Sequence, residues 1–154
     1  MFRHSWLLFV IATTFNGGLW WLRAQPRIDE NPALRKSYAR LIRGWLIYGN
    51  VPWLVMGMGI LLGGVPSPIT YFNPRNGPFV FLFYLSVVAI WAAMFRWLFF
   101  KQGAEELVRH PGCLNFSFDR PWEVKALFLT FLAVGVCALV LMLYGNTPIP
   151  PLGK

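Results

Sequence analysis

Histidine and cysteine are the residue types most often used to bind metals or attack substrates, and the chain has only two of each. The histidines, His4 and His110, fall at opposite faces of the expected membrane, so they cannot ligate one metal or haem together. Cys113 lies close to His110 in the sequence, but one thiol and one imidazole supply only half of a zinc site. Cys137 falls deep inside an apolar stretch, too far from Cys113 for a disulfide. We therefore predict two free thiols and no metal site.

The charged residues do not favour transport chemistry. Proton- and cation-coupled transporters usually carry a carboxylate inside the membrane. Here no acidic residue lies deep inside an apolar stretch, and all six fall on the cytoplasmic side, Glu123 at the very start of the last stretch: Asp29, Glu30, Glu105, Glu106, Asp119 and Glu123. Apart from Lys125 in the first turn of the last stretch, Arg96 is the one basic residue within such a stretch, and its long side chain can extend to the nearby interface. The sequence thus predicts no catalytic residue and no coupled pump.

Two asparagines are the most informative polar residues, because helical rise places them at one depth. Asn16 is six residues before the end of the first apolar stretch, and Asn50 is six residues after the start of the second. Both would lie about 9 Å below the same membrane surface. Gly17 and Gly49 permit a close approach of the two helices, and Pro52 leaves one carbonyl without its helical partner. We expect an interhelical polar contact here, and a ligand or permeation site at a broken helix is the alternative.

The second apolar stretch also contains a small-xxx-small motif, from Gly59 to Gly63. Such motifs favour close packing of membrane helices. The motif does not distinguish packing within the chain from self-association. The predicted helix-contact residues are Asn16, Gly17, Gly49, Asn50, Pro52, Gly59 and Gly63.

Composition predicts the elements that carry these residues. The chain of 154 residues is 56% hydrophobic and only 13% charged, whereas soluble domains carry about 25% charged residues. Uncharged apolar stretches of about 18 residues or more can cross a hydrocarbon layer of about 30 Å. We predict an all-α integral membrane protein, a single domain over residues 1–154 with four transmembrane helices. The predicted spans cover residues 5–22, 44–64, 78–100 and 122–144.

Basic residues decide the predicted orientation. The segments 23–43 and 96–125 together hold 11 of the 14 Lys and Arg residues. Positive loops stay in the cytoplasm, which places both termini outside it. Because the positive charge lies beside membrane spans, the net charge of +8 reflects topology rather than nucleic-acid binding. A bacterial cytoplasmic membrane, or one derived from it, is the expected location.

Tryptophan positions agree with these spans, with two exceptions. Most of the eight tryptophans fall near a predicted membrane interface, which is the depth that indole rings prefer. Trp53 and Trp91 fall near the middle of the membrane instead. They are candidates for contact with other membrane components.

A basic amphipathic helix is predicted between the first two spans, over residues 32–43, and it can run straight into the second span. Asn31 is a suitable N-cap, and the proline after it suits a first helical position. Apolar residues recur on one face and basic residues fill the other, a pattern typical of helices that lie on a membrane surface and attract anionic lipid. The predicted lipid-headgroup residues are Arg35, Lys36, Arg40 and Arg43.

The extracytoplasmic side is rich in proline. The loop 65–77 is short and stiff, and the segment 148–151 near the C-terminus should adopt polyproline II. Within the loop, Tyr71, Phe72 and Arg75 form a predicted docking patch for an extracytoplasmic partner.

The layout, with four helices and a basic cytoplasmic loop leading into the second, resembles that of the trimeric membrane enzymes of eicosanoid and glutathione metabolism. In that family an acidic residue stands beside the asparagine of the second helix. The corresponding segment here, residues 49–53, has none. The resemblance is therefore one of architecture, and the family's activity and sites are not assigned to this chain.

Three functions fit these observations. We expect a non-catalytic accessory or assembly subunit of a larger membrane complex, such as an energy-transducing one, acting through helix–helix and lipid or pigment contacts. The alternatives are a small homo-oligomeric channel lined by the second helix and a membrane enzyme acting on a lipophilic substrate. The expected partners are membrane lipids and other membrane subunits or further copies of the chain. Bound lipid is the expected cofactor, with a pigment or quinone as the alternative.

Overall fold

The computed structural model describes residues 4–113 and 118–144, and helices hold 83% of them, with no strand in these two ranges. The predicted all-α class is confirmed for this part of the chain. Three segments are long and apolar enough to cross a membrane, which indicates a membrane-embedded protein: Pro32–Leu61, Pro78–Phe100 and Pro121–Tyr144. The elements in chain order are α1 (Trp6–Glu30), the 3-10 helix η1 (Pro32–Leu34), α2 (Arg35–Leu61), the 3-10 helix η2 (Pro68–Phe72), α3 (Pro78–Phe100), α4 (Gly103–Arg109) and α5 (Pro121–Tyr144).

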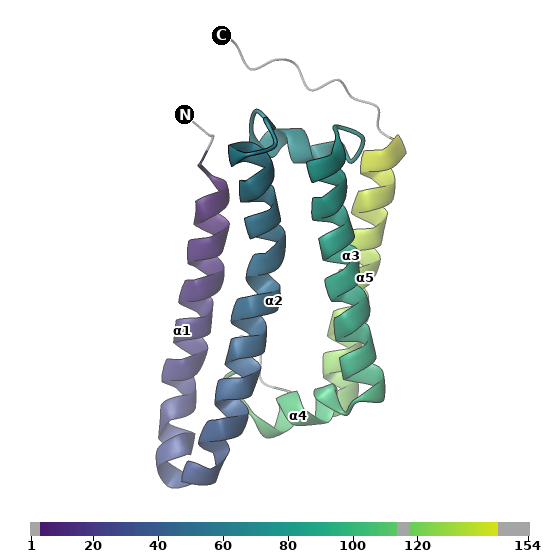
Figure 1. Cartoon of the computed structure of the whole chain (residues 1–154). Helices are drawn as coiled ribbons and strands as arrows, with labels where there is room; N and C mark the ends of the chain where they lie inside the picture. Colours follow the sequence, from purple (N-terminus) through teal and green to yellow (C-terminus); the bar gives the residue numbers. More distant parts are fainter. Residues whose placement is uncertain (1–3, 114–117, 145–154) are drawn as a thin grey trace.

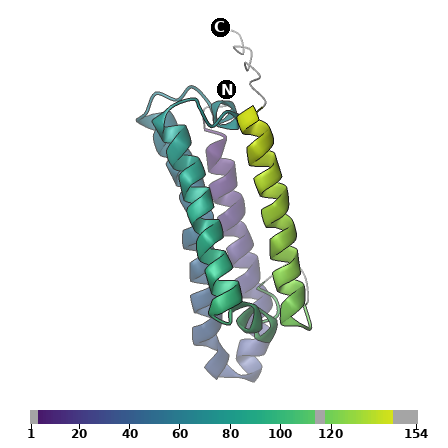
Figure 2. The ribbon, with the colours of Figure 1, turned by 90° about the vertical axis from the view of Figure 1, so that its right-hand side faces the viewer.

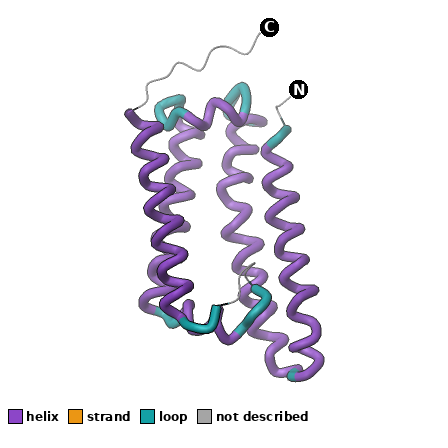
Figure 3. Tube along the Cα trace, turned by 180° about the vertical axis from the view of Figure 1, so that it is seen from behind, coloured by secondary structure: helices purple, strands orange, loops and turns teal. Residues whose placement is uncertain are grey.

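The four long helices run alternately up and down (Figure 1). α1 and α2 form a hairpin, α2 packs on α3, and α5 joins α3. Seen from behind, the α1–α2 pair lies on one side of the bundle and the α3–α5 pair on the other (Figure 3). After a quarter turn, α5 lies at one edge of the bundle (Figure 2). The start of α1, η2 and the end of α5 share one end of the bundle, called here the η2 end, and η1 and α4 lie at the other, the α4 end.

α1 differs from the expected span over residues 5–22. It continues through Pro26 to Glu30, eight residues past the predicted end. It is also not among the helices that are apolar enough to cross a membrane. Asn16, the two glycines after it and several tryptophans lower its hydropathy.

The predicted surface helix over residues 32–43 is not a separate element. η1 and the first turns of α2 take its place, and α2 then continues without a break to Leu61. Asn31 caps η1 with its side chain, as predicted. The apolar face, with Tyr38 and Ile42 buried, packs on the extension of α1. The apolar face of this amphipathic segment therefore forms the contact between α1 and α2 in a helical hairpin.

Buried side chains form three clusters along the bundle. The first joins α1 to the start of α2 near the α4 end, and the second joins α2, η2 and α3 near the η2 end. The third joins α3, α4 and α5. Their buried members are Trp20, Ala24, Ile28, Tyr38, Ile42 and Cys113; Met56, Ile60, Val65, Tyr71, Val80 and Phe83; and Leu98, Ala104 and Val124.

Candidate functional site

An apolar cavity of about 480 Å³ lies in the half of the bundle near η2. Its walls come from α1, α2, η2, α3 and α5, so each of the long helices contributes. Along α5 the lining runs from Met142 down to Gly135, and along α3 it runs from Phe83 to Trp91. This corresponds to about 10 Å along the bundle axis by helical rise. Ligand pockets typically enclose about 300–1,000 Å³, so the cavity is large enough to be a binding site.

Aromatic rings form the cavity wall from α1 to α3. Phe9 of α1 stacks on Trp53 of α2, with ring centroids 4.4 Å apart. Trp53 lies 6.1 Å from the ring of Phe83 in α3, and Tyr71 of η2 meets that ring edge-on at 5.2 Å. Stacked and edge-on pairs favour particular ring orientations. The wall is therefore a well-defined apolar surface.

The tyrosine hydroxyls at this wall are already used within the chain. Tyr71 Oη donates to the backbone carbonyl of Met56 at 3.1 Å. Tyr84 Oη donates to the backbone carbonyl of Tyr71 and lies 3.3 Å from the sulfur of Met142. Burial raises the pKa of Tyr71 above its ordinary value of 10.0, so the hydroxyl stays protonated as a donor. Neither hydroxyl proton is therefore free to be donated to a polar ligand.

The wall on α5 is made of less bulky side chains. Ala138 and Leu139 line it, and Gly135 lies directly against Trp91. A methyl group added at Gly135 would come within 2.5 Å of the Trp91 ring. Trp53 and Trp91, the two tryptophans that the sequence placed away from the interfaces, therefore both line this cavity.

The predicted glycines of the first helical hairpin lie where α1 and α2 touch. A methyl group at Gly17 would come within 2.7 Å of Leu46 Cδ2, and one at Gly49 would come within 2.9 Å of Thr13 Cγ2. The two helices therefore approach closely at these positions.

The two asparagines do not share a hydrogen bond in the described part of the chain. Asn50 is buried in α2, and its Nδ2 donates to the carbonyl of Leu46 in the same helix at 2.8 Å. Its Oδ1 is buried without a hydrogen-bond partner there. Asn16 is half-buried on α1, and the buried Pro52 leaves α2 continuous. That the two amides face each other stays a prediction.

Gly59 and Gly63 pack α2 against α3 of the same chain. A methyl group at Gly59 would lie 2.8 Å from Cβ of Phe79 and would overlap the Tyr71 hydroxyl. A methyl group at Gly63 would overlap the Phe79 ring. The small-xxx-small motif thus makes an intramolecular contact in this structure.

The three residues of the predicted docking patch differ in their exposure to solvent. Tyr71 is only 3% exposed and belongs to the packed core. Phe72 is 60% exposed and lies at the cavity, and Arg75 is exposed in the loop after η2. The predicted polyproline segment 148–151 lies outside the described residues. The surface available to a partner here is therefore smaller than predicted.

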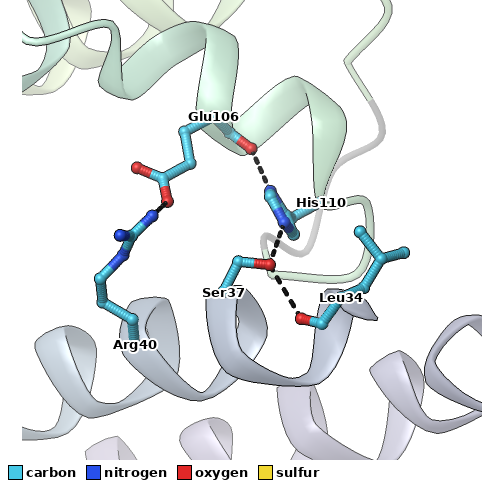
Figure 4. Close-up of polar contacts among 5 residues, drawn as sticks. All are labelled: Leu34, Ser37, Arg40, Glu106 and His110. Atoms are coloured by element: carbon cyan, nitrogen blue, oxygen red, sulfur yellow. Dashed lines mark hydrogen bonds and ion pairs between the residues drawn. The ribbon is translucent and has the colours of Figure 1, made fainter. Parts of the chain in front are cut away.

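A polar cluster at the α4 end connects α4 to α2 (Figure 4). His110 is only 7% exposed, and its Nε2 lies 2.7 Å from Ser37 Oγ. Its Nδ1 lies 2.7 Å from the backbone carbonyl of Glu106, and the Ser37 hydroxyl lies 2.8 Å from the carbonyl of Leu34. A carbonyl only accepts, so Nδ1 carries a proton.

Ion pairs add to the attachment of α4. Arg40 of α2 pairs with Glu106, and their side chains point toward each other (Figure 4). Lys125 of α5 pairs with Glu105 at 3.3 Å. The other predicted headgroup residues are exposed on the first turns of α2: Arg35, Lys36 and Arg43.

The turn after α4 is buried against the α1–α2 hairpin. Cys113 is fully buried there, and Tyr38 Oη donates to the carbonyl of Pro111 at 3.0 Å. Burial, with a smaller contribution from the charge of Glu106, raises the pKa of the Cys113 thiol to about 12. Both cysteines are free, as predicted, and Cys137 is exposed on α5.

Sequence reasoning missed the pairing of Ser37 with His110, because 73 residues separate them. A hydroxyl and an imidazole within hydrogen-bond reach, with the second ring nitrogen oriented by an acceptor, is the geometry of a nucleophile and its base. This pair, however, is at the opposite end of the bundle from the cavity. Its arrangement fits a structural link between α4 and α2.

Neither a cluster of metal-ligating side chains nor a likeness to a known protein assigns an activity to this chain. Within residues 4–113 and 118–144, no three potential metal-ligating side chains come together. No known family model, no curated protein and no solved structure matches the chain.

Proposed function

We propose that the chain is a four-span membrane protein with both termini outside the cytoplasm, and that it works as a non-catalytic accessory or assembly subunit. The orientation is supported by charge, because the segments with most of the basic residues belong to the α4 end of the bundle. α1 would supply the fourth span, since its first 17 residues, 6–22, carry no charge.

The observation that carries the subunit proposal is the incomplete packing of α5. None of the most apolar stretch of α5 is buried, and Val124, at the α4 end, is its one buried residue. Elsewhere its face toward the bundle borders the cavity. In lipid, helices associate through shape packing and interhelical hydrogen bonds. A helix that is packed so little by its own chain is a suitable contact surface for another subunit.

The two alternatives have less support. A pore lined by α2 would use its glycines and Asn50, but Gly49 and Gly59 pack against α1 and α3 of the same chain, and Asn50 is buried. An enzyme would draw on Ser37 and His110, and replacing Ser37 by alanine would then abolish turnover of a lipophilic substrate. The burial of His110 makes access by such a substrate difficult.

Site-specific photocrosslinking in the native membrane tests the subunit proposal. A benzophenone amino acid at Val134 or Leu141, both highly exposed on α5, should give adducts with one or a few defined membrane proteins. The same amino acid at Leu22, equally exposed on α1, serves as the matched control and should give weaker or different adducts. Adducts with lipid alone from all three positions would contradict the proposal.

A further inference from the structure

We propose that the cavity near η2 is a binding site for one acyl chain of a membrane phospholipid. The proposal requires only that the bundle is embedded in a membrane, and it does not depend on the subunit role. The ligand would lie along the bundle axis and enter the cavity from the side, beside α5.

The chemistry of the lining selects a hydrocarbon chain. Apart from Ser5 at one end, the walls are formed by apolar and aromatic side chains, and the hydroxyls of Tyr71 and Tyr84 donate to backbone carbonyls. A quinone ring or a metal-containing pigment needs polar partners for its carbonyls or metal, and the apolar middle of this wall supplies none. A chain of methylene groups needs none.

The position of the cavity fits a chain that enters from one leaflet. The lining begins beside Ser5 and η2 at one end of the bundle and ends near Trp91 and Gly135. Its length of about 10 Å lies within the roughly 15 Å of hydrocarbon in one leaflet. A lipid chain lies along this same direction. The cavity therefore has the depth and the orientation of an acyl chain.

The packing of α5 explains where the space comes from. Ala138 and Leu139 of α5 and Val87 and Val88 of α3 all line the cavity, while Gly135 allows Trp91 to close the inner end. α1 and α5 both line the cavity, and they make few contacts with each other. A chain can thus enter sideways from the bilayer.

A cationic group is also present at the correct level for a headgroup. Arg75 is exposed in the loop that follows η2, and it is the one Lys or Arg of the described residues at this end of the bundle. Phosphate is a suitable partner for a guanidinium. A phospholipid with its chain in the cavity would place its headgroup at this end.

Native mass spectrometry of the full chain, purified in mild detergent with palmitoyl-oleoyl phosphatidylglycerol, tests the proposal. The wild type should retain one phospholipid per chain after extensive detergent exchange. Ala138→Phe fills the cavity and should weaken retention by at least about tenfold. Ala133→Phe makes the same change on an exposed position of α5 and should retain the lipid.

A second cavity-filling variant keeps the test valid if the first variant does not fold. Val87→Phe fills the cavity from α3, where Val87 is partly buried, and Leu85→Phe on the exposed face of α3 is its control. Helicity by circular dichroism selects the folded variants. Equal lipid retention in a folded cavity variant and its control would overturn the proposal. So would organic extraction of a quinone or pigment, in place of phospholipid, as the retained molecule.

Discussion

Replacing Gly59 by alanine should destabilise the protein, although alanine favours a helix over glycine by about 1 kcal/mol. The added methyl group would lie 2.8 Å from Cβ of Phe79, an atom held close to the α3 backbone. It would also overlap the Tyr71 hydroxyl, which donates to the carbonyl of Met56. Overpacking typically costs about 1–3 kcal/mol. Loss of the buried hydrogen bond adds about 1–3 kcal/mol. The expected net loss is about 3 kcal/mol.

Reversible unfolding in mixed micelles, followed by circular dichroism against the fraction of denaturing detergent, measures this change. Gly44→Ala is the matched control on the same helix, because no heavy atom lies within 4 Å of its added methyl group. The control should be neutral or stabilised by up to about 1 kcal/mol.

A double-mutant cycle tests the mechanism as well as the magnitude. In a Tyr71→Phe background the hydroxyl is gone, so Gly59→Ala should cost about 1–3 kcal/mol less than in the wild type. Equal effects of Gly59→Ala and Gly44→Ala would refute the assigned packing of α2 on α3. An unchanged cost in the Tyr71→Phe background would refute the role given to Tyr71.

Three further predictions concern polar groups. In the same unfolding titration, Ser37→Ala should lower the free energy of unfolding by about 1 kcal/mol and His110→Ala by about 2–3 kcal/mol. No change for either variant would contradict the link between α4 and α2. Asn50→Leu should leave the free energy of unfolding unchanged or raise it by about 1 kcal/mol, because Oδ1 of Asn50 is buried without a hydrogen-bond partner in the described residues. A loss above about 2 kcal/mol would contradict this assignment. Since the pKa of Cys113 is raised from 9.0 to about 12, the folded thiol keeps its proton while the unfolded thiol ionises. The contribution of Cys113 to stability should thus be constant below about pH 9 and fall as the pH rises toward 12. Iodoacetamide at pH 9 should modify Cys113 only after unfolding, so rapid modification of the folded protein would contradict its burial.

The apolar helices could be predicted closely from the sequence. The third span was expected over residues 78–100 and α3 has these limits, and the span expected over 122–144 corresponds to α5. A long run without charge has few alternatives to a membrane helix, because backbone groups in lipid must be satisfied within the segment. Local composition was enough for these two elements.

The helical hairpin at the α4 end could not be predicted in the same way. Residues 23–30 hold four charges and Pro26, a pattern that favours a loop when it is considered alone. They are helical because Ala24 and Ile28 pack on Tyr38 and Ile42 of α2. That pairing is tertiary, and helix propensity gives only a weak indication of it.

The candidate site was predicted only in part. Trp53 and Trp91 stood out by their depth, and both line the cavity. Tyr71 was expected at the surface because it lies in a loop, yet its hydroxyl reaches a carbonyl of α2 and the ring is buried. The partner of His110 lies 73 residues away and has no local signal.

The mass of the native particle tests the central claim most directly. The protein should be extracted from its own membrane in mild detergent, purified through a tag on the chain and weighed intact by native mass spectrometry. Our account predicts a particle that contains the chain at 17.7 kDa together with at least one different membrane protein at fixed stoichiometry. A particle made only of this chain, which conducts ions in planar bilayers or converts a lipophilic substrate, would contradict it.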